Sequence, residues 1–341
     1  MYLGDERKTC LSSADMSAAG FSFPARVGRV VYRHFLPLGI LFDAVVGITW
    51  PQPGLALHRS GALSFIIFAI FVCSGLSLDM GALLSQVRRL KAPVYAIVAV
   101  SGVFPVVGFV VGRVLTLPPG DFVGLMVVAS SPTTLGSGII LSNIAGGSLP
   151  LAILTTIVCS MSAVVLMPTV LQVALGLGMR IDLPVGQMMK ELGYLILLPT
   201  LIGQLLRRPL AEHLERFWSV LTFLPNLLVV MMIFIAISKG SSELRGRGLL
   251  LIAHVACVVL SLHIVMLGVN YTAGRIMRLP EPDVRTITLV ASQKTLPLST
   301  FVAMTYFAQY PTAVVPCLLF YLCQILVDSL MAHRWARGSR I

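Results

Sequence analysis

Apolar runs, most of them 16 to 28 residues long, recur along the chain and are separated by short polar stretches. As a helix, each run is long enough to cross the hydrocarbon layer of a bilayer, which is about 30 Å thick. The ten predicted spans cover residues 36–50, 61–78, 93–115, 122–145, 149–176, 187–206, 222–238, 249–276, 285–308 and 312–333. The pattern therefore predicts an all-α polytopic membrane protein with ten transmembrane helices in a lipid bilayer.

The composition narrows the class of protein further. Of the 341 residues, 57% are hydrophobic and 11% are charged, whereas about 25% are charged in a typical globular domain. The net charge is +11, but the 25 Lys and Arg residues lie between the apolar runs, so we expect no nucleic-acid partner. Metalloprotease, nucleophile-elbow and phosphate-loop motifs are missing from the sequence. We therefore expect no enzymatic activity and no organic cofactor.

The basic residues also predict the orientation of the chain. Ten spans place both termini on one side of the membrane, and that side receives 17 Lys and Arg residues against 7 on the other. Because basic residues are enriched on the cytoplasmic side, both termini are predicted to be cytoplasmic, in a plasma membrane of the bacterial inner-membrane type. Residues 1–35 contain no apolar core of signal-peptide length, so no cleavage is expected.

Two predicted spans are interrupted near the middle of the membrane. In the fourth span Pro132 follows about ten residues, which as a helix cover about 15 Å or half of the hydrocarbon layer. In the ninth span Lys294 and Pro297 lie at a similar depth. Proline removes a backbone donor and clashes with the preceding turn, so both helices are expected to unwind. The simpler alternative is a pair of kinks whose backbone groups bond to nearby Ser and Thr.

The broken spans occupy matching places in the two halves of the chain. Pro132 and Pro297 are 165 residues apart, and Pro37 and Pro199, in the first span of each half, are 162 apart. Because five spans are an odd number, the second half forms an inverted repeat, which is typical of secondary transporters. The chain is predicted to have three parts: a cytoplasmic N-terminal segment (residues 1–35), a transmembrane transporter domain (residues 36–333) and a cytoplasmic tail (residues 334–341). Within the transporter domain, the first repeat covers residues 36–176 and the second covers residues 187–333.

Lys294 is the most informative single residue. An ammonium at the bilayer centre costs at least about 2.5–3.5 kcal/mol and is rarely kept without a function. The alternative is a structural salt bridge, for which Asp43 in the first span and Asp328 in the tenth are the candidate partners. We favour a functional role.

Hydroxyl and amide side chains surround the two breaks. Such oxygens, together with freed carbonyls, suit a hard cation such as Na⁺ or a polar substrate. Because a single membrane Ser or Thr usually bonds to its own helix, only the cluster as a whole indicates a site. Its members include Ser130, Ser131, Thr133, Thr134, Ser137, Ser142 and Asn143 in the fourth span, Ser292, Gln293, Thr295 and Ser299 in the ninth, and Thr155 in the fifth.

Three segments carry a family resemblance: SSPTTLGSG in the fourth span, ASQKTLPLS in the ninth, and FVCSGLSLDM in the second. With them the chain resembles the bile acid:sodium symporter family, in particular the branch with a Ser-Gln-Lys-Thr/Ser-Leu motif in the ninth helix. The resemblance covers about residues 30–335. It implies a panel domain of spans 1, 2, 6 and 7, a core domain of spans 3 to 5 and 8 to 10 in which spans four and nine cross, and sodium-driven uptake of an organic anion.

The same resemblance assigns sodium ligands. Ser137 and Thr155 match hydroxyl ligands of one sodium site, and Gln293 matches the ninth-span glutamine of the other. Sodium-coupled members have an acidic residue, an asparagine and a glutamine where this chain has Leu289, Gly138 and Val100. The coupling ion is therefore predicted to be sodium or a proton.

The presence of Lys294 and the absence of these three ligands suggest an alternative to a bound sodium ion. A fixed ammonium near the crossing could supply the positive charge that sodium supplies elsewhere. An amine in a low-dielectric site can also release its proton, which would link transport to protons.

We predict a secondary active transporter that moves a small organic anion by alternating access. The alternatives are a transporter-fold regulator or binding partner without net transport and, less favoured, a channel. The candidate substrate- and ion-binding residues are Lys294, Gln293, Thr295, Ser292, Thr133, Thr134, Ser137, Gly138, Asn143 and Thr155, with helix breaks at Pro132 and Pro297.

Overall fold

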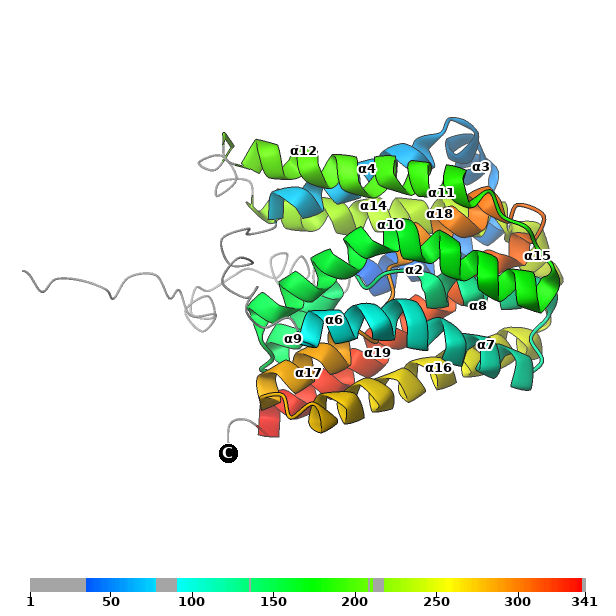
Figure 1. Cartoon of the computed structure of the whole chain (residues 1–341). Coiled ribbons are helices and arrows are strands. Elements are labelled where there is room, and N and C mark those ends of the chain that lie inside the picture. Colours follow the sequence, from blue (N-terminus) through cyan, green and yellow to red (C-terminus); the bar gives the residue numbers. More distant parts are fainter. Residues whose placement is uncertain (1–34, 78–90, 135, 208, 211–217, 339–341) are drawn as a thin grey trace, which may run out of the picture.

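The computed structural model describes residues 35–77, 91–134, 136–207, 209–210 and 218–338, and all regular structure in these residues is helical (Figure 1). The helices are α2 (Phe35–Thr49), α3 (Gln52–Arg59), α4 (Ala62–Ser77), α6 (Lys91–Val98), the π-helix η2 (Ala99–Val103), α7 (Phe104–Val114), α8 (Pro119–Ser130), α9 (Ser137–Ile144), α10 (Leu149–Met179), α11 (Val185–Leu192), the π-helix η3 (Gly193–Leu197), α12 (Leu198–Arg207), α14 (Trp218–Lys239), α15 (Ser241–Gly246), α16 (Leu249–Ile276), α17 (Glu281–Val290), α18 (Leu296–Tyr306), the 3-10 helix η4 (Pro311–Ala313) and α19 (Val314–Gly338).

Helices occupy the apolar stretches that the hydropathy pattern predicts. Among the described residues, five helical stretches are each long and apolar enough to cross a membrane: Lys91–Val114, Leu149–Met179, Val185–Arg207, Leu249–Ile276 and Pro311–Arg337. The pair α3 and α4, bent by 77°, would be a sixth if counted as one span. The chain is therefore a multi-pass helical membrane protein.

The ends of the chain differ from the prediction in one respect. Helix α19 continues to Gly338, so helix covers the first part of the predicted tail, residues 334–341. The predicted segment 1–35 lies outside the described residues except for Phe35.

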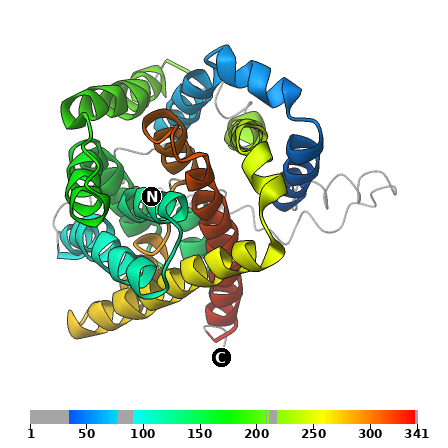
Figure 2. The ribbon, with the colours of Figure 1, turned by 90° about the vertical axis from the view of Figure 1, so that its right-hand side faces the viewer.

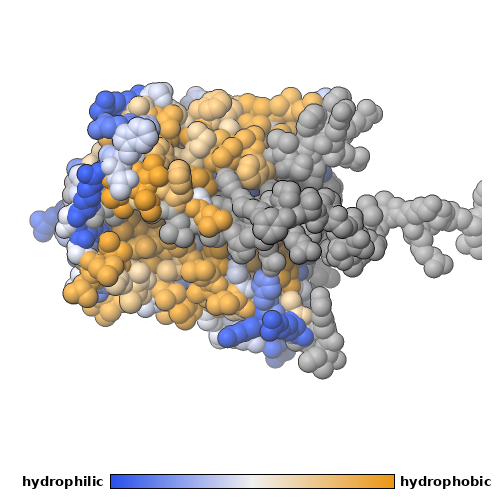
Figure 3. All heavy atoms as spheres, turned by 180° about the vertical axis from the view of Figure 1, so that it is seen from behind, coloured by the Kyte–Doolittle hydropathy of each residue, from blue (hydrophilic) through white to orange (hydrophobic). Residues whose placement is uncertain are grey.

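The outer surface is apolar, as a bilayer requires. Leu249 and Leu250 at the start of α16 are 81% and 87% exposed, and Phe65 on α4 is 72% exposed. Figure 3 shows apolar side chains over most of the described part of one face, with hydrophilic side chains gathered toward its ends. In water such exposure would be unfavourable, but lipid tails solvate these side chains without cost.

The helices pack in two groups, which lie side by side in Figure 2. In the panel group, α4 packs against α12 and α14, and α14 packs against α2. In the core group, α10 packs against α6, α8, α9 and α17, while α19 packs against α16, α18 and α8. Gly75 and Gly203 let α4 and α12 approach to backbone contact, since a Cβ at Gly203 would lie 2.8 Å from the amide nitrogen of Leu76. The grouping resembles in part the panel and core that the resemblance implies, but α11 and η3, which precede α12, pack against α10 of the core group.

Two helices of the core group are each broken in the middle. The predicted fourth span contains α8 and α9, and the predicted ninth contains α17 and α18. Helix α8 packs against α18, and α9 packs against α17. The two broken helices therefore run in opposite directions and meet at their breaks (Figure 1).

Candidate functional site

The non-helical segments between these half-helices form the centre of the candidate site. Helix α8 ends at Ser130 and α9 begins at Ser137, with Pro132 in the gap. Helix α17 ends at Val290 and α18 begins at Leu296. Pro297 is in the first turn of α18, where a missing N–H leaves no helical bond unmade. Both spans therefore unwind rather than merely kink.

Direct hydrogen bonds join the two breaks. The amide of Thr295 donates to the carbonyl oxygen of Pro132 at 2.9 Å. The hydroxyl of Thr133 donates to the carbonyl oxygen of Val290, the last residue of α17, at 2.5 Å. Each break thus satisfies backbone groups that the other leaves open, as buried polar groups require.

Four helix ends meet at this crossing. The carbonyl ends of α8 and α17 carry partial negative charge, whereas the amide ends of α9 and α18 carry partial positive charge. The crossing therefore offers separate places for a cation and for an anion, in a region where few other charges are present.

Lys294 places its ammonium at the carbonyl end of α8. Its side chain is 1% exposed, and Nζ donates to the carbonyl oxygens of Ser131 and Val100, each at 2.8 Å. Nζ also lies 4.1 Å from the centre of the Phe104 ring, whose face attracts cations. Two carbonyls and one aromatic face match the three donors of an ammonium group.

The carbonyl oxygen of Val100 is free because of a local irregularity in the third span. In the π-helix η2 the amide of Phe104 donates to Ala99 rather than to Val100. The next residue, Pro105, has no N–H. The bulge thus leaves one backbone oxygen free to accept a hydrogen bond from Lys294. Such π-bulges occur frequently at functional sites.

Neither predicted salt-bridge partner contacts Lys294. Asp328 is bonded to Gln293 and His263 instead. Asp43 is buried on α2, in the panel group. Among the described residues, no carboxylate lies within ion-pair distance of Lys294. The salt-bridge hypothesis is therefore wrong, because the ammonium is satisfied by backbone oxygens.

Neighbouring helices hold the backbone of the second break in place. Gln324 on α19 accepts from the amide of Lys294 at 2.8 Å and donates to its carbonyl oxygen at 2.9 Å. Asn270 on α16 donates to the hydroxyl of Ser292 at 2.8 Å and accepts from the hydroxyl of Tyr95 at 2.7 Å. These contacts fix the direction in which the break presents its side chains.

A continuous chain of side chains links the two breaks beside Lys294. Ser137, the first residue of α9, donates to Oε1 of Gln293 at 2.9 Å. The Nε2 of Gln293 donates to Oδ2 of Asp328 at 2.6 Å, and Oδ1 of Asp328 lies 2.9 Å from Nε2 of His263. A Cβ at Gly138 would lie 3.2 Å from Oε1 of Gln293, so glycine permits the close approach.

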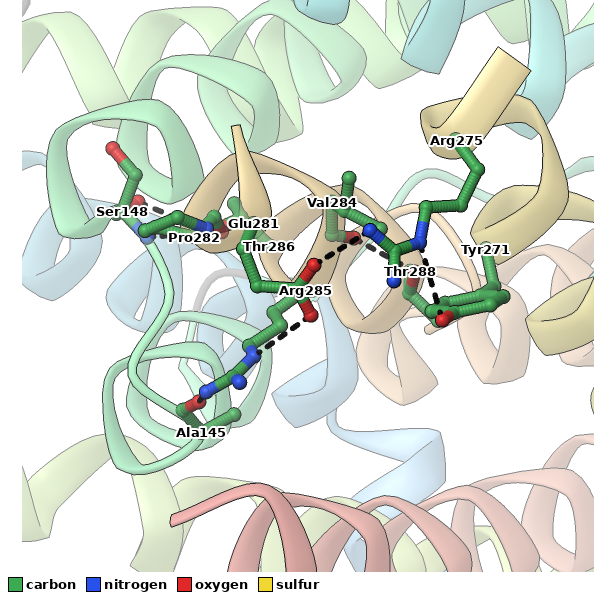
Figure 4. A network of polar contacts seen from close by, with 10 residues as sticks. All are labelled: Ala145, Ser148, Tyr271, Arg275, Glu281, Pro282, Val284, Arg285, Thr286 and Thr288. Carbon is green, nitrogen blue, oxygen red and sulfur yellow. Dashed lines mark hydrogen bonds and ion pairs between the residues drawn. The ribbon is translucent and has the colours of Figure 1, made fainter. Parts of the chain in front are cut away.

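The other end of this pair of half-helices is tied by charged side chains, as Figure 4 shows. Arg285 donates to the carbonyl oxygen of Ala145 at the end of α9 at 2.8 Å, where a cation complements the helix dipole. Glu281 pairs with Arg285 at 3.4 Å and with Arg275 at 2.9 Å. The hydroxyl of Thr286 accepts from the amide of Ser148 at 2.7 Å. Helices α9 and α17 are thus fixed at the crossing and at their far ends.

The two breaks differ in how far they are open. The second break is buried throughout, from Ala291 to Thr300. In the first break Gly136 is exposed, and Thr134 and Ser137 are half-buried. The first break is therefore the less buried of the two.

The remaining predicted residues differ in their surroundings. Asn143 is exposed in the last turn of α9. Thr155 is buried on α10, and its hydroxyl has no hydrogen-bond partner among the described residues. Leu289 packs against Leu141 and Ala332 in a small apolar cluster, so this position contributes packing and not an oxygen.

Several residues at the site were not predicted by the sequence pattern. They are Phe104, His263, Asn270, Gln324 and the Asp328 carboxylate in its observed role. A signal was present for some of them, because a polar side chain inside an apolar span is uncommon and usually faces protein. Which partner each one meets depends on the packing of the helices.

Comparison with known proteins agrees with this geometry. Residues 34–337 match the SBF-like CPA transporter family (DUF4137). The chain is 25% identical over 340 residues to the probable chloroplastic sodium/metabolite cotransporter BASS4 of Oryza sativa subsp. indica, covering 95% of this chain and 80% of that protein. It is 25% identical over 313 residues to sodium/bile acid cotransporter 7-B of Xenopus laevis, covering 88% and 90%. It is 24% identical over 310 residues to probable chloroplastic sodium/metabolite cotransporter BASS1 of Oryza sativa subsp. japonica, covering 91% and 74%.

Proposed function

Because this chain belongs to the SBF-like CPA transporter family, among the relatives of bile acid:sodium symporters, we propose that it is a secondary active transporter coupled to sodium. It moves a small organic anion across the membrane by alternating access. The relatives named above are described as cotransporters and not as enzymes, in agreement with the sequence-based expectation. The observation that carries the proposal is the crossing of two broken helices around the buried Lys294.

The proposed architecture is ten transmembrane helices in two inverted repeats, residues 36–176 and 187–333, with both termini cytoplasmic in a bacterial-type inner membrane. The opposite directions of the two broken helices support it. So does a pair of matching π-bulges: η2 ends two residues before Pro105, and η3 ends two residues before Pro199. Because of each bulge, the missing N–H of the proline costs no helical hydrogen bond.

Lys294 acts in this proposal as a built-in cation. Its ammonium lies on the carbonyl end of α8 and on the freed carbonyl of Val100, which are oxygens of the kind that bind sodium in broken-helix transporters. A covalently held charge there removes the need for one bound ion. It also adds a positive field that favours an anionic substrate.

A sodium ion is assigned to the neighbouring oxygens. The Oε1 of Gln293 and the hydroxyl of Ser137 come from opposite breaks and are 2.9 Å apart. Thr155 adds a buried hydroxyl without a partner among the described residues. Neutral oxygens of this type suit a hard monovalent cation. The substrate anion would reach the amide end of α9 along the more open first break, near Thr134.

Alternating access requires the panel group to move against the core group. At the end that carries α15, two polar contacts join α18 of the core group to the stretch Val185–Arg207, which ends in α12, and to α14. Tyr306 at the end of α18 donates to Glu191 on α11 at 2.6 Å, and Lys239 on α14 donates to the carbonyl oxygen of Met304 at 2.9 Å. In this proposal these contacts break when that end of the transporter opens.

Sodium titration of the purified protein tests the coupling ion without knowledge of the substrate. A ligand that binds only the folded state stabilises it by RT ln(1 + [L]/Kd). We expect a saturable rise in the unfolding midpoint with NaCl and none with KCl at matched ionic strength, at two pH values. An unfolding midpoint that changes with pH but not with sodium would indicate that the coupling ion is a proton. Equal responses of the midpoint to NaCl and KCl would contradict a sodium site.

The alternative function is that of a regulator or binding partner with a transporter fold and no net transport. Its distinguishing property is flux. Reconstituted in sealed vesicles, a transporter gives saturable uptake driven by a gradient, whereas a regulator gives none. Neither outcome depends on the sodium titration, so the two experiments are independent.

A further inference from the structure

We propose that Asp328 supplies the negative charge that balances the cation bound by Gln293 and Ser137, although it lies on a different helix and acts through the Gln293 amide. This inference rests on the proposed function, because it takes sodium as the ligand. The carboxylate is fully buried on α19, and its Oδ2 accepts from Nε2 of Gln293 at 2.6 Å. Only one amide group thus separates the carboxylate from the cation-binding oxygen.

The geometry orients Gln293 for this role. Because its Nε2 is held by Asp328, its Oε1 must point the other way, toward Ser137. A carboxylate that accepts from the N–H side of an amide increases the negative charge on the oxygen side, since hydrogen-bonded groups in a row polarise one another. Asp328 therefore both positions Gln293 and strengthens its oxygen as a ligand.

Among the described residues, no Lys or Arg pairs with Asp328. Its Oδ1 pairs with Nε2 of His263, whose Nδ1 is buried and has no partner among the described residues. The Nε2 of His263 is thus the second group that holds the carboxylate in place, beside the Gln293 amide.

Other charged groups on the surrounding helices are directed elsewhere. Lys294, next to Gln293 in the chain, donates to the carbonyl oxygens of Val100 and Ser131. Several other charged groups on the helices that pack against α16 and α19 also have partners of their own: Asp121 pairs with Arg247, Arg113 donates to the carbonyl of Gly178, Lys239 donates to the carbonyl of Met304, and Arg285 bonds to Glu281 and to the carbonyl of Ala145.

An apolar shell strengthens the effect. Ala332, one turn after Asp328 on α19, packs with Leu289 and Leu141, and Phe320 lies with its ring centre 5.4 Å from that of His263. In such surroundings a carboxylate interacts with a nearby ion far more strongly than in water.

Equilibrium binding of radioactive sodium to the purified full-length protein tests the inference. In Asp328→Asn, which keeps the size and the acceptor for Gln293, the sodium Kd should rise by about tenfold or more. The matched control Asp182→Asn removes an exposed carboxylate before α11 and should leave the Kd unchanged. The variant Asp328→Asn with Gln293→Glu exchanges the two groups and keeps a hydrogen bond between them, so it should regain sodium binding.

The outcomes separate this inference from the proposed function. An unchanged Kd in Asp328→Asn, or a folded exchange variant that does not bind sodium, would overturn the role of Asp328. Wild type without sodium binding would overturn both the role of Asp328 and sodium coupling. Sodium binding that depends on Asp328, in a protein without flux, would support the inference while the transport function fails.

Discussion

Replacement of Lys294 by Ala is expected to abolish sodium-driven accumulation of the substrate anion. The variant removes a fixed charge from the carbonyl end of α8 and leaves the carbonyl oxygens of Val100 and Ser131 without donors. A charge effect of roughly 3 kcal/mol in this low-dielectric setting corresponds to about 100-fold in rate or affinity. Uptake into vesicles is the measurement, with Lys190→Ala, an exposed lysine on α11, as the matched control.

The same variant should respond to sodium differently from the wild type. Removal of the ammonium leaves a space lined by two carbonyl oxygens, which are hard ligands for a small cation. At high concentration sodium should enter this space and raise the unfolding midpoint a second time, beyond the rise seen in the wild type. Normal uptake by Lys294→Ala, or a sodium response identical to that of the wild type, would show that Lys294 does not replace an ion.

Replacement of Gln324 by Leu is expected to destabilise the protein and to stop transport together. Gln324 satisfies both the amide and the carbonyl of Lys294, and all of these atoms are buried. An unsatisfied buried polar group costs about 1–3 kcal/mol, so two of them should cost roughly 2–6 kcal/mol and lower the unfolding midpoint by several degrees.

The control for this prediction is Gln187→Leu. Gln187 is exposed on α11 and donates a hydrogen bond to Glu191 in the next turn, so its loss should change the free energy of unfolding by less than about 0.5 kcal/mol. If Gln324→Leu unfolds at the wild-type temperature and still transports, the second break does not depend on α19 for its conformation.

Much of the fold could be predicted from the sequence because membrane helices obey strong constraints. The apolar runs located the helices to within a few residues, since every backbone group in lipid must be satisfied locally. Pro132 and Pro297 located the two breaks, and the hydroxyl and amide residues beside them included Ser137 and Gln293, which the fold brings together. These were predictable because each depends on a local chemical signal.

The partners of Lys294 and Asp328 were not predictable, because they depend on contacts between distant segments. Lys294 bonds to Val100 through a backbone oxygen, and no side-chain pattern reports which carbonyls are free. Only the π-bulge before Pro105 explains it. The sequence makes Asp328 a candidate partner for Lys294, but helix packing turns the carboxylate toward Gln293 and His263. The position of Asn143 in the sequence makes it a candidate binding residue, although its side chain is exposed in the last turn of α9.

The most direct test of the central claim is ion-driven accumulation by the reconstituted protein. Vesicles containing wild type or Lys294→Ala are exposed to a cell metabolite extract with an inward sodium or potassium gradient, and their contents are identified by mass spectrometry. We predict that an organic anion accumulates in wild-type vesicles with the sodium gradient, is lost when an ionophore collapses that gradient, and is absent from Lys294→Ala vesicles. Equal contents under sodium and potassium, and in both proteins, would contradict a sodium-coupled transporter with Lys294 at its centre.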